Sequence, residues 1–321
     1  MRLILAYPVE EKHLGQIRAA APGYEVVDAG QERLSEEIRS ADLFCGHVKV
    51  PVCWEEVVRG GRLRWIQSSA AGLDHCLPQE VVESEIVVSS ASGVLADQVA
   101  EHAMALIGAT LRKLPTFYEA QKKREFVRRP TQDLHGATVG IVGFGGVGRR
   151  LAELLMPYQV RIVATDWFPT NKPAGVDALW PPEQLGQLLA VSDLVVLCAP
   201  LTEITRGMIA SETLAQMQPH AVLVNVARGP LVVERDLVAA LRANVIAAAA
   251  VDVTEQEPLP SSSELWQLAN VLITPHVAGQ SRTRIDKMTD FFCENLLRYQ
   301  SGRPLLNRVD KRLGFPVPLP S

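Results

Sequence analysis

The chain has 321 residues, which favours two domains, and its composition of 47% hydrophobic and 21% charged residues allows large buried cores. The formal net charge of −4 argues against nucleic acid or an anionic membrane surface as a partner. Because no apolar run has the length of a membrane span or a signal peptide, and the five cysteines show no C-x-x-C spacing, we expect a cytoplasmic protein with free thiols, no disulfide framework and no metal site.

The first part of the chain alternates short β-rich runs with polar stretches that favour helices, such as 10–21 and 31–41. The runs do not alternate between apolar and polar residues, which is typical of strands buried on both faces of a parallel sheet. Strands are predicted at 2–7, 24–27, 42–47, 64–69 and 86–90.

A long helix is predicted over 95–114, LADQVAEHAMALIGATLRKL. It is apolar on nearly all sides, so we expect it to be buried between two units and to link them. The pattern then restarts, and this second part predicts six strands, at 138–143, 161–166, 194–199, 221–227, 247–253 and 271–275. A last helix is predicted over 284–302, and we expect the proline-rich tail after it to be extended.

The first strand of the second part runs into a glycine-rich segment, GIVGFGGVGRR. Gly143, Gly145 and Gly148 fit G-x-G-x-x-G between a strand and a helix. Such glycines permit a tight turn, a close approach of pyrophosphate and close packing of helix on strand. The alternative is a glycine-rich turn without a ligand, but six strands behind such a turn favour a doubly wound dinucleotide-binding domain.

Asp166 ends the second of these strands, 18 residues beyond Gly148 (166 − 148 = 18). A carboxylate at about this interval is typical of a residue that hydrogen-bonds the adenosine ribose, and it repels the 2′-phosphate of NADP. Trp167 and Phe168, which follow it, offer no cation for that phosphate. We therefore expect NAD rather than NADP as the cofactor; the alternative is a solvated loop aspartate.

Three later strands of this part end in residues suited to chemistry. The fourth leads to Arg228, the fifth to Asp252 and Glu257, and the sixth to His276. Singly, these could be a surface arginine, loop carboxylates and a capping histidine. Together they lie at the carboxyl edge, where ligands of open α/β sheets bind, and predict hydride transfer between a nicotinamide and a 2-oxo or 2-hydroxy acid. Arg228 would hold the substrate carboxylate and His276 would protonate the ketone oxygen, while Glu257, if close enough, would orient the ring and favour imidazolium.

The chain also resembles the D-isomer-specific 2-hydroxy-acid dehydrogenases over nearly its whole length. The resemblance is carried by SSAAGLDH, VGFGGVGRRLAELL, LCAPLTEITRGMI, LVNVARGPLVVERDLVAAL, AAVDVTEQEPLP and LITPHVAG. It implies an α/β fold of two doubly wound parallel-sheet domains. A Rossmann NAD-binding domain at 99–286 would be inserted into a smaller flavodoxin-like substrate domain at 1–98 and 287–321, with the active site in the cleft between them.

The resemblance also implies roles for individual residues. Arg228, Glu257 and His276 match the family's catalytic residues, and Asp252 matches an aspartate near the nicotinamide amide. Further residues match cofactor contacts or, in the first domain, loops that meet the substrate. The cofactor set is Gly143, Gly145, Gly146, Val147, Gly148, Asp166, Pro200, Thr205, Ala227 and Gly279, and the substrate set is Val48, Ala71 and Gly72.

Two positions depart from the family's pattern. Gly146 stands where many members carry a bulky residue, often arginine, so a side-chain contact to phosphate would be lost while backbone contacts survive. Thr254 stands where an aromatic is common, which leaves Glu257 in register. Of the other histidines, only His47 and His75 fall near the expected cleft loops, where a minor substrate role is an alternative to a structural one.

Several functions stay open within this resemblance. Glyoxylate, hydroxypyruvate, phosphohydroxypyruvate and pyruvate are all candidate substrates, and a short glyoxylate/hydroxypyruvate-type reductase is favoured because no regulatory domain follows the last helix. Formate dehydrogenases share the fold but carry glutamine where this chain has Glu257, whereas phosphite dehydrogenases keep all three catalytic residues. Corepressors of the C-terminal-binding-protein type resemble the family and use NAD to control assembly. The family usually dimerises through its nucleotide domains, so we expect a homodimer.

Overall fold

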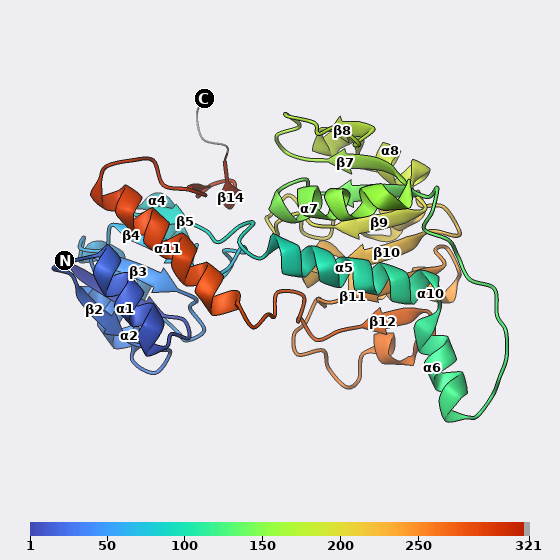
Figure 1. The fold of residues 1–321 in the computed structure, drawn as a ribbon, viewed down its shortest axis with the longest axis horizontal. Helices are drawn as coiled ribbons and strands as arrows, with labels where there is room; N and C mark the ends of the chain where they lie inside the picture. The colour runs from blue at the N-terminus through green and yellow to red at the C-terminus, as the bar shows by residue number, and fades with distance from the viewer. Residues whose placement is uncertain (318–321) are drawn as a thin grey trace. The chain divides into compact units, whose positions relative to one another are not determined.

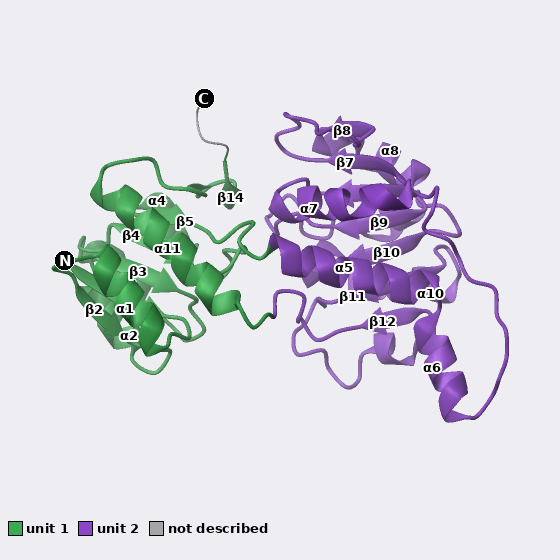
Figure 2. Cartoon of the chain, in the orientation of Figure 1, with its two compact units in different colours: residues 1–95, 281–321 green, residues 96–280 purple. Residues whose placement is uncertain are grey.

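The computed structural model describes residues 1–317 and divides the chain into two compact units. Unit 1 consists of Met1–Leu95 together with the chain from Ser281 onward, and unit 2 of Ala96–Gln280 (Figure 2). Unit 2 is therefore inserted into the sequence of unit 1.

Unit 1 is built on a five-stranded sheet in which every neighbouring pair is parallel. The strand order, β2-β1-β3-β4-β5, is that of flavodoxin-like folds. All five predicted strands are present, as β1 (Arg2–Ala6), β2 (Glu25–Asp28), β3 (Leu43–Gly46), β4 (Trp65–Ser68) and β5 (Val87–Ser89).

The helices of unit 1 include α11 (Arg284–Gln300), which follows unit 2 in sequence and packs beside α1 (Glu11–Ala20) (Figure 1). Met288, Phe292 and Leu296, four residues apart, form its buried stripe and pack in one core with Leu3 and Leu5 of β1. The shorter helices are α2 (Leu34–Glu37), α3 (Trp54–Arg59), α4 (Gln79–Glu83) and the 3₁₀ turn Ile38–Ser40.

The tail after α11 was expected to be extended. Its described part forms a small antiparallel pair, β13 (Val309–Asp310) and β14 (Phe315–Pro316). The last four residues of that prediction, 318–321, lie outside the described residues.

Unit 2 contains a seven-stranded parallel sheet in the order β12-β11-β10-β9-β6-β7-β8. Read from β8, this is the 3-2-1-4-5-6 order of a Rossmann domain with one more strand at the end. Both predicted parallel sheets, and with them the predicted fold class, are confirmed. The strands are β6 (Thr138–Val142), β7 (Arg161–Thr165), β8 (Ala178–Trp180), β9 (Leu194–Leu197), β10 (Val222–Asn225), β11 (Ala248–Val251) and β12 (Val271–Ile273).

The edge strand β8 was not predicted. It has three residues, all only partly buried, so it shows neither a long apolar run nor an alternating pattern. Its pairing with β7, rather than its own composition, makes it a strand.

The predicted long helix is α5 (Ala96–Leu111), which belongs to unit 2 and lies beside α7 (Gly146–Leu155) (Figure 1). It buries one stripe, including Ala100, Ala103 and Ile107, in a core shared with the sheet of unit 2. The expectation of burial on nearly all sides is wrong, because Glu101 and Ala105, which lie between these positions, are exposed.

The other helical segments of unit 2 connect its strands. They are α6 (Leu114–Lys122), α8 (Leu185–Val191), α9 (Ser211–Leu214), α10 (Glu234–Arg242) and the 3₁₀ turns Met156–Tyr158, Pro182–Gln184, Gly229–Leu231 and Glu264–Gln267. Among residues 1–317, none of the helices combines the length and the apolar character needed to cross a bilayer.

Candidate functional site

The predicted site residues of unit 2 follow strands that end level with one another. Val142, Leu197, Asn225, Val251 and Ile273 are register neighbours across β6, β9, β10, β11 and β12. The segments after these strands therefore emerge at one edge, spaced about 4.8 Å per strand and spanning about 19 Å from β6 to β12. The chain order reverses beside β6, so the ligand crevice of such a sheet is expected between β6 and β9.

In the glycine loop after β6, two glycines are packed so closely that a Cβ would clash, and a third has free space around it. Gly143 has φ +91°, and a Cβ there would come within 2.5 Å of the Ala199 nitrogen after β9. A Cβ on Gly148 would lie 2.3 Å from the Gly143 oxygen. At Gly145, the N-cap of α7, a Cβ would meet no atom within 4 Å. Gly145 thus leaves room beside a helix N-terminus, as a dinucleotide pyrophosphate requires.

Asp166 follows β7 and closes the loop from the other side. Its Oδ2 accepts the Phe144 N–H at 2.6 Å, and its Oδ1 accepts the Phe168 N–H at 2.9 Å. Each carboxylate oxygen keeps a further acceptor site, so the group can still bind ribose hydroxyls.

Arg149 brings a cation to this region that the sequence pattern did not indicate. Its guanidinium carbon lies 5.0 Å from the centre of the Phe144 ring, and the group donates to the carbonyls of Thr170 (3.2 Å) and Asn171 (3.0 Å). Arg149 reaches the loop after Asp166 from α7, so the residues that follow Asp166 in sequence do not reveal it.

His276 and Glu257 meet at the far end of the edge. The His276 Nδ1 and the Glu257 Oε2 are 2.6 Å apart, and the Glu257 Oε1 accepts the Thr254 N–H at 3.2 Å. The two side chains are 48% and 38% exposed, so the pair is accessible to a small molecule. With Nδ1 donating to the carboxylate, Nε2 is the ring nitrogen left to exchange a proton with a substrate.

Arg228 lies directly after β10, between the glycine loop and this pair along the edge. Its Nη1 donates to the Ala227 carbonyl at 2.8 Å, and its own carbonyl accepts from the Asn225 Nδ2 at 3.0 Å. A Cβ on the next residue, Gly229, would come within 1.8 Å of the Thr254 oxygen. The loops carrying Arg228 and Glu257 therefore touch backbone to backbone, which only a glycine allows.

Asp252 is deeply buried, with 1% of its surface exposed. Both of its carboxylate oxygens accept hydrogen bonds from the turn that carries His276. The remaining cofactor candidates lie along the same edge: Gly146 and Val147 in the first turn of α7, Pro200 and Thr205 after β9, Ala227 after β10, and Gly279 after β12.

In unit 1, one histidine joins the two loops predicted to meet the substrate. His75 Nδ1 accepts the Val48 N–H at 3.2 Å, and its Nε2 lies 2.9 Å from the Ser68 Oγ. Its ring also stacks on His47, with the centroids 3.8 Å apart. His75 therefore links the loop after β3, with Val48, to the loop after β4, which contains the exposed Ala71 and the partly buried Gly72.

The histidine, cysteine and acidic side chains of the described residues form no metal cluster, and the cysteines are unpaired. Between residues 1 and 317, no group of three or more histidine, cysteine, aspartate or glutamate side chains could hold a metal ion. The five cysteines are free, and burial raises the pKa of the Cys198 thiol, close to the glycine loop, to about 12. That thiol is therefore neutral near pH 7 and a poor nucleophile.

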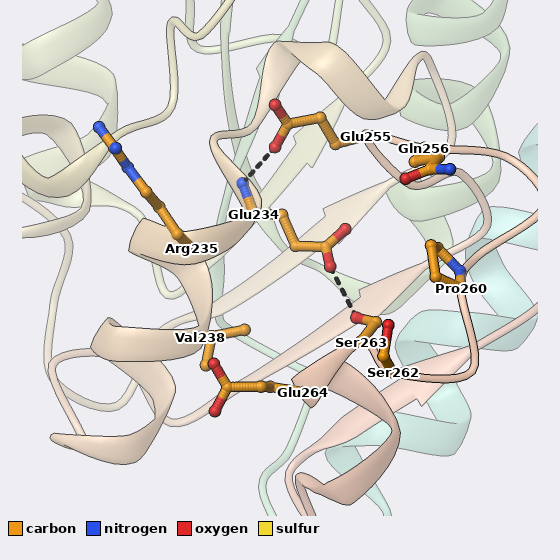
Figure 3. A pocket seen from close by; sticks show the side chains of 9 residues that line it. All are labelled: Glu234, Arg235, Val238, Glu255, Gln256, Pro260, Ser262, Ser263 and Glu264. Carbon is orange, nitrogen blue, oxygen red and sulfur yellow. Dashed lines mark hydrogen bonds between the residues drawn. The ribbon is translucent and has the colours of Figure 1, made fainter.

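A surface pocket opens beside the loop after β11, but it contains none of the predicted catalytic residues (Figure 3). Its wall is held by two bonds of Glu234, whose N–H donates to the Glu255 Oε2 (2.9 Å) and whose Oε1 accepts from the Ser263 Oγ (2.6 Å). Three glutamates dominate the lining, which suits neither a 2-oxo acid nor a phosphate. The lining residues are Glu234, Arg235, Val238, Glu255, Gln256, Pro260, Ser262, Ser263 and Glu264.

The sequence of this chain is similar to those of known dehydrogenases. Residues 104–278 match the NAD-binding domain of the D-isomer-specific 2-hydroxyacid dehydrogenases. An uncharacterised protein of Corynebacterium melassecola is 35% identical over 295 residues, covering 90% of this chain and 95% of that protein. A glyoxylate reductase of Pyrococcus furiosus is 31% identical over 295 residues, covering 88% of this chain and 86% of that enzyme.

Solved structures agree over almost the whole chain. A D-isomer-specific 2-hydroxyacid dehydrogenase of Xanthobacter autotrophicus, in complex with NADPH and MES, superposes with a TM-score of 0.83 at 30% identity, covering 98% of this chain and 99% of that one. An NADPH-dependent glyoxylate/hydroxypyruvate reductase of Sinorhizobium meliloti, in complex with NADP and sulfate, gives a TM-score of 0.83 at 26% identity, with the same coverage.

Proposed function

The chain belongs to the D-isomer-specific 2-hydroxyacid dehydrogenase family, and from that premise we propose that it is an NAD-dependent reductase of small 2-oxo acids. The observation that carries the proposal is the 2.6 Å contact between His276 and Glu257, on the same sheet edge as an open glycine loop. Glyoxylate and hydroxypyruvate are the favoured substrates, because relatives at about this level of similarity act on them.

Each residue of the proposed site has one task. The bound nicotinamide supplies the hydride, or accepts it in the reverse direction. Arg228 holds the substrate carboxylate through its planar fork. His276 gives a proton from Nε2 to the ketone oxygen, and Glu257 holds the ring at Nδ1 and stabilises its charged form.

The cofactor is proposed to lie along the loops after β6, β7 and β9. The N–H groups at the start of α7, beside Gly145, would face its pyrophosphate, and Asp166 would bind the adenosine ribose. Val48, Ala71 and Gly72 of unit 1 are proposed substrate contacts, so unit 1 would be the substrate domain and unit 2 the cofactor domain.

A panel of 2-oxo acids with NADH and NADPH tests this proposal directly. We expect turnover of glyoxylate or hydroxypyruvate, and a kcat/KM at least about tenfold higher with NADH, because a 2′-phosphate beside Asp166 brings like charges together. Cofactor oxidation, followed by the absorbance of the reduced nicotinamide, measures both. Comparable values for NADH and NADPH would contradict the role of Asp166 and point to Arg149 as a phosphate contact.

The same panel separates the proposal from its alternatives. Turnover of formate or phosphite, with no 2-oxo acid reduced, would indicate a dehydrogenase of those anions. Tight NADH binding without turnover of any acid would indicate an assembly module that uses the cofactor as a ligand.

We also propose that the protein is a homodimer that pairs through the arm formed by α6 and residues 123–131, which extends from unit 2 (Figure 2). The arm exposes Leu114, Tyr118 and the fully exposed Phe126. Large apolar side chains gathered on one segment are typical of an interaction surface. The basic residues that flank them complement a chain of net charge −4, so a second copy is a suitable partner; they are Lys113, Lys123, Arg124, Arg128 and Arg129.

Light scattering after size exclusion tests the dimer. We expect a mass near twice 35.1 kDa. In the Phe126→Glu variant the mass should fall towards that of the monomer, because a charge replaces an apolar side chain that the proposed interface would bury. Leu297→Glu, on the partly exposed face of α11, is the matched control and should leave the mass unchanged. A monomeric wild type, or dissociation by the control variant alone, would contradict the arm interface.

A further inference from the structure

His276 has a backbone conformation that its side chain alone does not favour. Its φ is +53°, in the left-handed region that most residues other than glycine avoid. Such conformations persist only when surrounding contacts hold them, and they gather at functional sites. The contacts that hold His276 therefore also decide where its imidazole lies.

One residue supplies most of those contacts. The Asp252 carbonyl accepts the His276 N–H at 2.7 Å, the Asp252 Oδ1 accepts the Val277 N–H at 2.9 Å, and the Oδ2 accepts the Ala278 N–H at 2.9 Å. Three successive amides thus converge on Asp252. A left-handed residue followed by two converging N–H groups makes a small anion-binding concavity, which this buried carboxylate fills.

Two further side chains, those of Thr274 and His102, contact the Asp252 carboxylate or each other. The Thr274 Oγ1 donates to the Asp252 Oδ1 at 2.6 Å. Because that donation uses the only hydroxyl proton, the Thr274 Oγ1 accepts from the His102 Nε2, which lies 3.0 Å away. The His102 Nε2 is also 3.3 Å from the Asp252 Oδ1, so a protonated His102 would pair with the buried charge.

We propose that Asp252, Thr274 and His102 form a positioning network that holds the His276 turn for proton transfer, with His102 anchoring the turn to α5. Asp252 then acts through the backbone of His276, in addition to the cofactor contact implied by family resemblance. Neither His102 nor Thr274 carries another role in the proposed site. The inference rests on the proposed function of His276 as proton donor.

The hydroxyl of Thr274 is the most selective point at which to test the network. Thr274→Val keeps the shape of the side chain but removes the donor to Asp252 and the acceptor for His102, whereas Thr274→Ser keeps both. We expect kcat to fall about 10- to 100-fold in the valine variant, with KM for NADH within about twofold, and serine to restore activity to within about twofold of wild type.

His102 gives the second arm of the experiment. The amide nitrogen of glutamine can take the place of Nε2, so His102→Gln should keep most of the activity while His102→Leu should lower kcat as Thr274→Val does. Thr110→Val is the matched control, since Thr110 lies on the same helix and its buried hydroxyl has no hydrogen-bond partner in the described chain. That variant should leave kcat unchanged.

Amide hydrogen exchange at Val277 and Ala278 keeps the test independent of turnover. Exchange should speed up in Thr274→Val and stay slow in Thr274→Ser and Thr110→Val. Unchanged exchange in the valine variant, equal loss of kcat with serine and valine, or an effect confined to KM for NADH would each overturn the network. If the wild type reduces no 2-oxo acid, the proposed function fails, while the exchange measurement still decides whether the network exists.

Discussion

The His276→Asn variant is expected to reduce 2-oxo acids about 10²- to 10⁴-fold more slowly than the wild type, the range that general acid catalysis contributes. Asparagine offers no titratable group for the ketone oxygen. It does tolerate the left-handed φ of +53° at this position, and its amide can still donate to Glu257. The loss should therefore appear in kcat with the fold intact, measured as NADH oxidation at saturating substrate.

His220→Asn is the control for this substitution. His220 lies on the surface of the same unit, with its Nε2 2.6 Å from the Asp193 Oδ1, and is 55% exposed. Its replacement should leave kcat unchanged. A His276→Asn enzyme within tenfold of wild type, with normal thermal stability, would show that the proton comes from another group.

The partner carboxylate gives a second test of the same pair. Glu257→Gln keeps a hydrogen-bond acceptor near Nδ1 but removes the negative charge that faces the ring. We expect kcat for reduction to fall about 10-fold or more in this variant, with the fold intact, measured as NADH oxidation at saturating substrate. An unchanged kcat would count against the pair.

The Arg228→Lys variant is expected to lower kcat/KM for 2-oxo acids by about 10²-fold, mostly through a higher KM. Lysine keeps the positive charge but cannot offer the two parallel N–H donors of a guanidinium, and a hydrogen bond to a charged group is worth about 1.5–3 kcal/mol. It also loses the bond from Nη1 to the Ala227 carbonyl that aims the Arg228 side chain. Steady-state kinetics with glyoxylate and hydroxypyruvate measure the change.

Arg235→Lys is the matched control for Arg228. The Arg235 side chain is 87% exposed, 3.3 Å from Asp236, on the wall of the acidic pocket. It should change neither kcat nor KM, and neither substitution should alter the melting temperature by more than a few degrees. Retention of wild-type kcat/KM in Arg228→Lys would remove Arg228 from the substrate site.

Most strands could be predicted because each is a run of apolar residues between turn-forming residues. All five strands of unit 1 were predicted in this way, and six of the seven in unit 2. β8 escaped because a three-residue edge strand, partly exposed throughout, carries almost no periodic signal. The sequence also did not indicate which face of α5 is buried, since its alanines suit a buried or an accessible position equally well.

Some features of the candidate site could also be predicted from the sequence, while others depend on contacts between distant residues. Gly143, Gly145 and Gly148 could be recognised by spacing alone, yet which of them packs and which faces open space depends on atoms of other loops. Arg149 was missed as a cation because it reaches the loop after β7 from a helix that precedes it in sequence.

The sequence by itself determined the two parallel sheets, the family and the positions of Arg228, Glu257 and His276 after strand ends, because local apolar runs, turns and motif spacing carry that information. Only the tertiary structure decided which contacts hold those residues in place. His102 and Thr274 are 172 residues apart, and Val48 and His75 are 27 apart, so no local pattern could indicate that they are bonded. The left-handed turn at His276 likewise depends on the carboxylate of Asp252, 24 residues earlier (276 − 252 = 24). Family resemblance implied that Asp252 contacts the cofactor. The structure shows that it also accepts hydrogen bonds from the turn that carries His276.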